Sequence, residues 1–225
     1  IGNLLKWDGG VKAFLLDLFA HVVDGLGRNA PQVFALAHQG GHGHIVGRKR
    51  FSELETYKLI RPIADALKYM HSLGVVHRDL KPENILCEKG LKNIRIADFG
   101  LSQLVAPTVQ LKLACGTLSY VAPEVLNSLG YGSPADIWSL GVIAFLVIRG
   151  KLPYTAKTQE QTVKNIQESQ NVIKLDDKYW NTCSPECCDV ISRMLDKDPL
   201  TRITASEILT HEWSRRMAKE LKHNS

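Results

Sequence analysis

The chain has 225 residues, of which 44% are hydrophobic and 23% are charged, and these proportions predict a soluble globular chain with a core of ordinary size. The net charge of +5 is mild and spread along the sequence. It therefore favours a solvated surface and argues against a nucleic-acid partner.

A stretch rich in glycine and histidine, residues 40–47, precedes the first clear helix signal. Its glycines are spaced too widely for a phosphate-binding loop. His38, His42 and His44 have a spacing compatible with a metal site, but no cysteine or carboxylate is close in sequence. A flexible loop is the preferred interpretation, and a metal site is the alternative.

A long helix is predicted to begin at Ser52. Ser52 and Glu55 have the spacing of a capping box, in which each side chain bonds the other residue's backbone N–H. Apolar residues then recur at helical intervals until Gly74. One buried helix therefore leads into the next segment.

Residues 77–84, with the sequence His-Arg-Asp-Leu-Lys-Pro-Glu-Asn, bring three kinds of reactive group close together in the chain. This set suits a hydroxyl group that attacks a polyanionic phosphate. Asp79 would accept or orient the proton of the hydroxyl, and Lys81 would neutralise charge on the transferred group. Asn84 would supply a neutral oxygen to Mg²⁺.

Two strand-like segments, residues 84–87 and 93–97, predict a hairpin directly after this block. Asp98-Phe99-Gly100 follows the hairpin, and the Asp98 carboxylate is a second oxygen ligand for Mg²⁺. Ala122-Pro123-Glu124 comes further along the chain. Each triplet alone arises often by chance, but the three motifs in this order rarely coincide.

Residues 134–150 are apolar nearly all round, which is typical of a helix in a protein core. The apolar run between Asp136 and Arg149 is too short to span a bilayer, so no membrane partner is expected. Further helices are predicted at residues 159–168, 185–195 and 204–219.

The cysteines form an odd set without the paired spacing of a zinc site, namely Cys87, Cys115, Cys183, Cys187 and Cys188. Thiols in a reducing compartment are the simplest interpretation, so a cytoplasmic protein is expected, with the nucleus as an alternative. The start at Ile1 indicates a piece of a longer chain.

Residues 51–213 resemble the C-terminal lobe of a eukaryotic protein kinase, on the three motifs described above. The resemblance implies an α+β fold that is mainly α, with a small β-hairpin at the catalytic loop and an incomplete N-lobe. Residues 51–225 would form the C-lobe, with a catalytic loop at 77–84 and an activation segment at 98–124. Residues 1–50 would be a remnant of the N-lobe and hinge.

Two further details of the sequence resemble particular kinase groups. Lys81 together with Cys115-Gly116-Thr117 resembles the serine/threonine branch. Phe51-Ser52-Glu53 and His211-Glu212-Trp213 resemble the calcium/calmodulin-dependent group.

The resemblance implies that the γ-phosphate of ATP is transferred, with Mg²⁺, to serine or threonine of a protein substrate. It implies catalytic roles for Asp79, Lys81, Asn84 and Thr117, with Thr117 bonded to Asp79 and Lys81. Nucleotide or metal contacts would come from Lys81, Glu83, Asn84 and Asp98. Structural or regulatory roles would fall to His77, Arg78, Phe99, Gly100, Glu124, Asp136 and Arg202.

Two of the structural residues have a specific implied contact. Asp136 would hold the backbone of the catalytic loop, with an exposed carboxylate at a helix start as the alternative. Arg202 would form a buried ion pair with Glu124.

In the activation segment, Arg78 would grip a phosphate. The usual phosphothreonine position, four residues before Thr117, is Leu113, which has no hydroxyl. Thr108 or Ser102 could substitute, with an unmodified hydroxyl as the alternative. Activation by a partner such as calmodulin, or by a missing N-lobe segment, is therefore expected.

Residues 1–50 lack the expected nucleotide clamp of a complete kinase. No glutamate precedes Glu53, and neither Lys6 nor Lys12 has the sequence context of the nucleotide-binding lysine. Residues 33–36 would be the remnant of the hinge strand. The alternative to an active enzyme is therefore a catalytically dead, pseudokinase-like module that binds a partner protein.

Overall fold

The computed structural model describes residues 34–35, 50–88, 90–105, 111, 115–127, 130–168, 180 and 183–224. The stretch at 40–47, Lys6, Lys12, Thr108 and Leu113 lie outside these residues. The hypotheses about them, the metal alternative for the histidines included, therefore stay predictions.

Helix α3 (Glu53–Ser72) begins where the sequence predicts. The Glu55 N–H donates to Ser52 Oγ at 3.2 Å, and the Ser52 N–H donates to Glu55 Oε2 at 3.0 Å, so the capping box is confirmed. The helix is followed by Gly74 at φ 75°, where a Cβ would lie 2.7 Å from the Val105 carbonyl oxygen. Only glycine fits this reversal without strain, because it has no Cβ.

Helix α5 (Pro134–Arg149) lies in the middle of the core, and fourteen of its sixteen residues are buried. It ends at Gly150, whose φ of 70° gives a left-handed cap, and the Gly150 N–H donates to the Leu146 carbonyl at 2.7 Å. The sequence prediction of a core helix is therefore confirmed.

The predicted hairpin consists of β3 (Ile85–Glu88) and β4 (Lys92–Ile96), which pair antiparallel with Ile85 opposite Ile96. Strand β1 (Phe34–Ala35) pairs with the other edge of β3. The first strand begins one residue later than predicted because Asn84 belongs to the turn η1 (Pro82–Asn84) and uses its side chain there. A second small sheet joins β2 (Val75–Val76) to β5 (Gln103–Leu104).

The other helical elements among the described residues are η2 (Leu118–Tyr120), α4 (Pro123–Leu126), α6 (Gln159–Glu168), α7 (Pro185–Met194), α8 (Ala205–Thr210) and α9 (Glu212–His223). The prediction of one helix over 204–219 is wrong. His211 is extended, with ψ 152°, and its Nδ1 accepts the Trp213 N–H at 3.2 Å, which starts a new helix.

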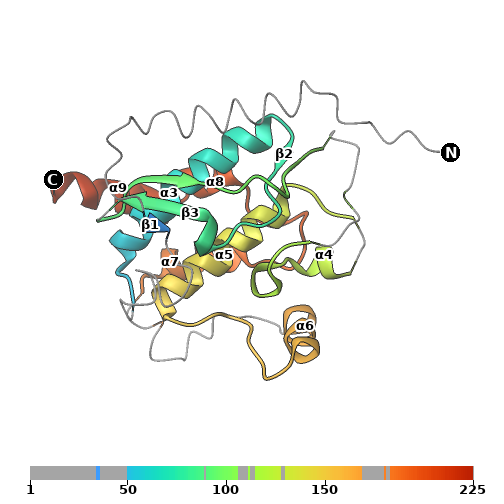
Figure 1. Ribbon diagram of the computed structural model, residues 1–225. Coiled ribbons are helices and arrows are strands. Elements are labelled where there is room, and N and C mark those ends of the chain that lie inside the picture. The colour runs from blue at the N-terminus through green and yellow to red at the C-terminus, as the bar shows by residue number, and fades with distance from the viewer. Residues whose placement is uncertain are drawn as a thin grey trace.

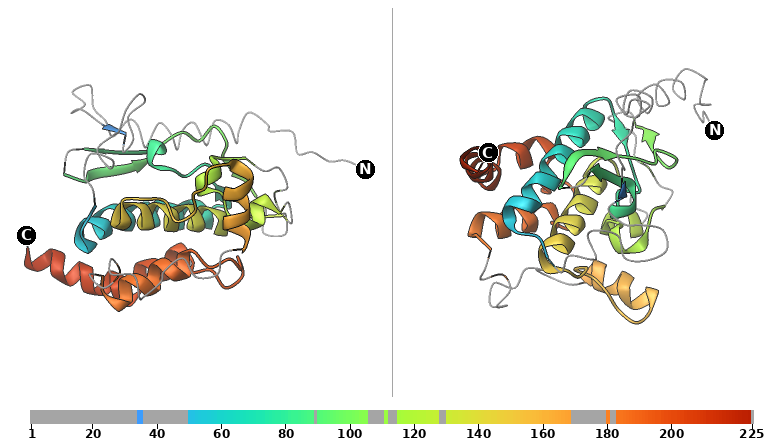
Figure 2. Two further views of the ribbon diagram at one scale, coloured as in Figure 1. Left: turned by 90° about the horizontal axis from the view of Figure 1, so that it is seen from below. Right: turned by 60° about the vertical axis from the view of Figure 1, so that its left-hand side comes forward.

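These elements form layers around α3 and α5, as Figure 1 and the left view of Figure 2 show. Strands β3 and β4 cover one side of the two helices, and α7, α8 and α9 cover the opposite side. Among the described helices, none has the length and apolar character needed to cross a bilayer. Residues 77–84 connect the strand layer to the central helices.

At Gly141, α5 packs tightly against the C-terminal end of α7. A Cβ at this position would lie 2.8 Å from Met194 Cβ and 3.0 Å from Leu195 Cδ2. We expect Gly141→Ala to lower the free energy of unfolding by about 1–3 kcal/mol, because a packed interior resists added volume. Urea unfolding measures this, with Gly132→Ala as the control, since a Cβ there would meet only Pro134 Cδ at 3.9 Å. Equal stability of the two variants would contradict this packing.

Candidate active site

The loop at residues 77–84 is held by Asp136, a carboxylate in the first turn of α5 that is 1% exposed. Asp136 Oδ2 accepts the His77 N–H at 2.9 Å, and Oδ1 accepts the Arg78 N–H at 2.9 Å. His71 Nε2 lies 2.9 Å from Oδ2. The predicted contact of Asp136 with the loop backbone is present, and an exposed carboxylate is excluded.

The buried Asp136 keeps a pKa below its usual value. Burial alone would raise the pKa, but the hydrogen bond and charge of His71 and the interactions of His77 together outweigh burial. The folded state therefore favours the ionised carboxylate, which suits an acceptor of backbone N–H groups.

This shift predicts a dependence of stability on acid. Because the folded pKa lies below the unfolded value of about 3.9, the stabilisation is complete above that value and is lost as the pH falls through the folded pKa. We expect Asp136→Asn to be less stable than the wild type at pH 7, and the difference in stability to narrow as the pH falls below about 4. Urea titrations across this range measure the difference, and a difference independent of pH would contradict the assignment.

The side chain of Asp79 is surrounded by the residues expected to act with it. Lys81 Nζ lies 2.6 Å from Asp79 Oδ2. The Thr117 N–H and hydroxyl donate to Asp79 Oδ1 at 3.0 and 3.2 Å, and Lys81 Nζ donates to Thr117 Oγ1 at 3.0 Å. The predicted contacts of Thr117 with both Asp79 and Lys81 are therefore present.

Asn84 completes this cluster from the turn η1. Its Nδ2 donates to the Asp79 carbonyl at 2.8 Å and to Asp79 Oδ2 at 3.3 Å. This leaves the amide oxygen Oδ1 as the atom suited to ligate a cation. The Asn84 carbonyl accepts the Ala97 N–H at 2.8 Å, which ties the turn to the residue before Asp98.

Asp98 lies two residues after β4 and has a φ of 58°, a backbone conformation that costs energy in a non-glycine residue. Its Oδ1 accepts the Gly100 N–H at 3.2 Å. The Phe99 ring packs edge-on against the buried His77, with 5.2 Å between ring centroids. Glu83, in contrast, is exposed and has no described hydrogen bond within this cluster.

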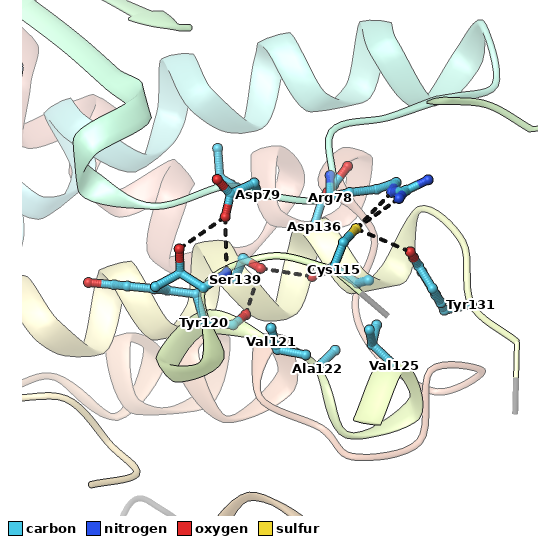
Figure 3. A pocket seen from close by; sticks show the side chains of 13 residues that line it. Arg78, Asp79, Cys115, Tyr120, Val121, Ala122, Val125, Tyr131, Asp136 and Ser139 are labelled. Carbon is cyan, nitrogen blue, oxygen red and sulfur yellow. Dashed lines mark hydrogen bonds between the residues drawn. The ribbon is translucent and has the colours of Figure 1, made fainter. Parts of the chain in front are cut away.

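Among the described residues, the hydrogen-bond partners of the Arg78 side chain are Cys115 and Gln103. With a φ of 73°, it donates from Nε and Nη2 to Cys115 Sγ at 3.1 and 2.8 Å, and from Nη1 to Gln103 Oε1. Cys115 Sγ lies 3.6 Å from the Tyr131 hydroxyl, and Figure 3 shows these two side chains pointing toward each other. Burial and the hydrogen bond with Cys115 raise the pKa of Tyr131. Sequence reasoning missed Gln103 and Tyr131, because neither belongs to a motif.

One pocket is lined by Arg78, Asp79 and Cys115, by residues of the segment that precedes α4 and by residues of α5 (Figure 3).

Ser102 carries one of the two hydroxyls considered as phosphate acceptors. It is buried, and its Oγ donates to the His77 carbonyl at 3.4 Å. Ser102 is therefore closed to a modifying enzyme in this conformation.

The segment that carries Glu124 is anchored by Arg202. Nη1 and Nη2 of Arg202 bind Oε1 and Oε2 of Glu124 at 2.6 and 2.9 Å, so the predicted buried ion pair is confirmed. Arg202 also donates to the Pro134 and Asp196 carbonyls at 2.8 and 2.7 Å. Its guanidinium carbon lies 5.2 Å from the centre of the Trp138 ring.

A sequence profile described as "Protein kinase domain" matches residues 32–214. The chain belongs to the protein kinase family. Its mainly helical architecture, with few strands among the described residues, agrees with the C-lobe of the kinase fold.

Three relatives of this kinase illustrate the match. Myosin light chain kinase A of Dictyostelium discoideum is 39% identical over 171 residues, which make up 75% of this chain and 57% of the relative. Aurora kinase of the same organism is 44% identical over 163 residues, 72% of this chain and 40% of the relative. Serine/threonine-protein kinase 33 of Bos taurus is 36% identical over 192 residues, 80% of this chain and 39% of the relative.

The kinase thus spans between 39% and 57% of the length of these curated relatives. The chain is homologous to serine/threonine kinases, a class of enzymes that use ATP and typically Mg²⁺. Asp79, Lys81, Asn84 and Thr117 come together within this matched region.

Proposed function

We propose that this kinase transfers the γ-phosphoryl group of ATP to serine or threonine hydroxyls of protein substrates. The observation that carries the proposal is the cluster around Asp79, in which a carboxylate, an ammonium and a hydroxyl bond one another at 2.6–3.2 Å. A positioned base beside a cation suits attack by a hydroxyl on a phosphate.

Each member of the cluster has a distinct task in the proposed reaction. Asp79 orients the substrate hydroxyl and accepts its proton. Lys81 neutralises charge that develops on the transferred phosphoryl oxygens. Thr117 holds the carboxylate of Asp79 through two donors, its N–H and its hydroxyl, which fixes the base in one orientation.

The oxygen atoms near this cluster suit magnesium, which prefers hard ligands and keeps several waters. Asn84 Oδ1 and the Asp98 carboxylate would hold the ion. Oδ1 is the available atom of the Asn84 amide, because Nδ2 already donates to Asp79. When bound, Mg²⁺ would neutralise charge on the nucleotide phosphates. Glu83 is exposed and would contribute at the edge of the nucleotide or to a basic substrate.

Activation by a partner fits this kinase better than activation by phosphorylation of the activation segment. Residue 113 is a leucine, Ser102 is buried, and Arg78 is bonded to Cys115 and Gln103. We infer membership of the calcium/calmodulin-dependent group, a cytoplasmic location, and activation by calmodulin or by an N-lobe segment. Two relatives named as myosin light chain kinases support the group.

One specific observation favours a second function, a catalytically dead module that binds a partner protein. Residues 1–50 contain no glutamate and no lysine in the context of the nucleotide-binding lysine. In a complete kinase this lysine pairs with a helix glutamate, and without that pair part of the nucleotide's binding surface would be absent. The two functions differ in whether Mg²⁺ and ATP bind together.

Calorimetry of this chain with ATP and Mg²⁺ distinguishes these functions. Binding in the micromolar range, about −8 kcal/mol, supports the kinase proposal if it disappears in Asp98→Ala. Asp65→Ala is the matched control, because Asp65 is an exposed aspartate on α3. The absence of binding in the wild type would overturn the kinase proposal for this chain and favour the module.

A further inference from the structure

Away from the active site, two cysteines and a glutamate gather at the start of α7. One ligand atom each from Glu53, Cys183 and Cys187 lies within 4.8 Å of the other two. Cys187 is fully buried, and Glu53 and Cys183 are half-buried. Glu53 lies 130 positions or more from both cysteines, so the fold, not the local sequence, creates this cluster.

The carboxylate of Glu53 is held in one orientation by its neighbours. Oε2 accepts from the Ser184 hydroxyl at 2.8 Å, Trp213 Nε1 at 3.2 Å and Arg216 Nη2 at 2.7 Å. Oε1 accepts the Ser184 N–H at 2.6 Å and retains a lone pair. Such outer contacts orient ligands in protein metal sites.

The cysteines are also fixed by backbone contacts. The Cys183 N–H donates to the Trp180 carbonyl at 2.9 Å, and the Cys187 N–H donates to Ser184 Oγ at 3.2 Å. Cys187 lies in the first turn of α7, where the helix dipole favours negative charge. A hydrogen bond with Cys183 and burial raise the pKa of the Cys187 thiol, which favours the protonated form of this thiol.

We propose that Glu53, Cys183 and Cys187 form a binding site for a thiophilic divalent cation, for which Zn²⁺ is the probe. Two sulfur ligands and one oxygen ligand are a donor set that Zn²⁺ accepts, with water in the fourth position. Each thiol loses its proton to solvent as its sulfur bonds the cation, and no electron is transferred. The two thiolates and the carboxylate then carry three negative charges, which the divalent cation and the adjacent Arg216 guanidinium neutralise.

Occupation of this site would join the central helix α3 to α7 and α9, two helices of the layer opposite the strands. Glu53 opens α3, Cys187 lies in α7, and Trp213 and Arg216 belong to α9. A bound cation would therefore raise the stability of the folded chain, because the ligands come together only in the folded state.

Titration of the full chain with Zn²⁺, in competition with a chromogenic chelator, tests the proposal. We expect one equivalent to bind with a dissociation constant of about 1 µM or tighter, with release of protons and a rise in Tm. Cys183→Ser should weaken binding by about 100-fold or more, since loss of an outer contact alone costs 10–100-fold. Cys188→Ser is the matched control, because it removes the adjacent thiol and keeps all three ligands.

Three results would overturn the proposal. The first is that the wild type does not bind Zn²⁺, and the second is that Cys183→Ser binds it as tightly as the wild type. The third is that two thiols of the wild type react with a thiol reagent only after reduction. The last result would assign Cys183 and Cys187 to a disulfide. Because Cys183 is half-buried at a turn, its serine variant is expected to fold, and circular dichroism checks this.

Discussion

Arg202→Ala is expected to lower the free energy of unfolding by about 3–5 kcal/mol, because it leaves the Glu124 carboxylate buried without its cation. Both side chains are almost fully buried, at 4% and 6% exposed, and the two oxygens of Glu124 bind two nitrogens of Arg202. For a chain of this size each kcal/mol corresponds to about 2–4 °C, so Tm should fall by about 6–20 °C.

Thermal and urea unfolding measure this loss against a matched variant. Arg215→Ala also removes an arginine, but from an exposed position on α9, and should change stability by less than about 0.5 kcal/mol. Replacing both Arg202 and Glu124 by apolar residues should recover part of the loss, because no charge is then stranded. An Arg202→Ala variant that melts with the wild type would contradict the importance of this ion pair.

Asp79→Asn is expected to reduce the rate of phosphate transfer by about 10²–10⁴-fold. Asparagine keeps the shape of the side chain but cannot accept a proton, and it removes the anion that pairs with Lys81. The kcat for a peptide substrate measures this effect, and Tm should stay close to that of the wild type.

Variants of Thr117 separate the base from the residue that positions it. Thr117→Ala removes the hydroxyl but keeps the N–H that donates to Asp79, so its loss of rate should be smaller than that of Asp79→Asn. Thr117→Ser restores the hydroxyl and should recover most of the rate. A rate for Asp79→Asn above about a tenth of the wild-type rate would remove Asp79 from the role of base.

Features with a local physical cause could be predicted from the sequence. The capping box of Ser52 and Glu55 depends on two side chains three residues apart, and the structure has both of its hydrogen bonds. The core helix α5 could be predicted because it is apolar nearly all round and leaves no polar face for water. The contacts of Asp136 and of Arg202 with Glu124 came instead from the family resemblance.

Features created by distant residues could not be predicted in the same way. The break at His211 depends on one side chain that caps the next helix, although the apolar pattern continues across it. Arg78 binds Cys115 and Gln103, which lie 37 and 25 positions away and belong to no shared pattern. The cluster of Glu53 with Cys183 and Cys187 likewise required the packing of α3 against the later helices.

Transfer of radiolabelled phosphate from ATP to a library of serine- and threonine-containing peptides tests the central claim most directly. The chain and its Asp79→Asn variant would be compared at equal concentration with Mg²⁺. The account predicts label on serine or threonine with the wild type, reduced by about 10²-fold or more in the variant. Equal, background-level labelling by both proteins would contradict it and would leave the chain as a module that binds a partner protein.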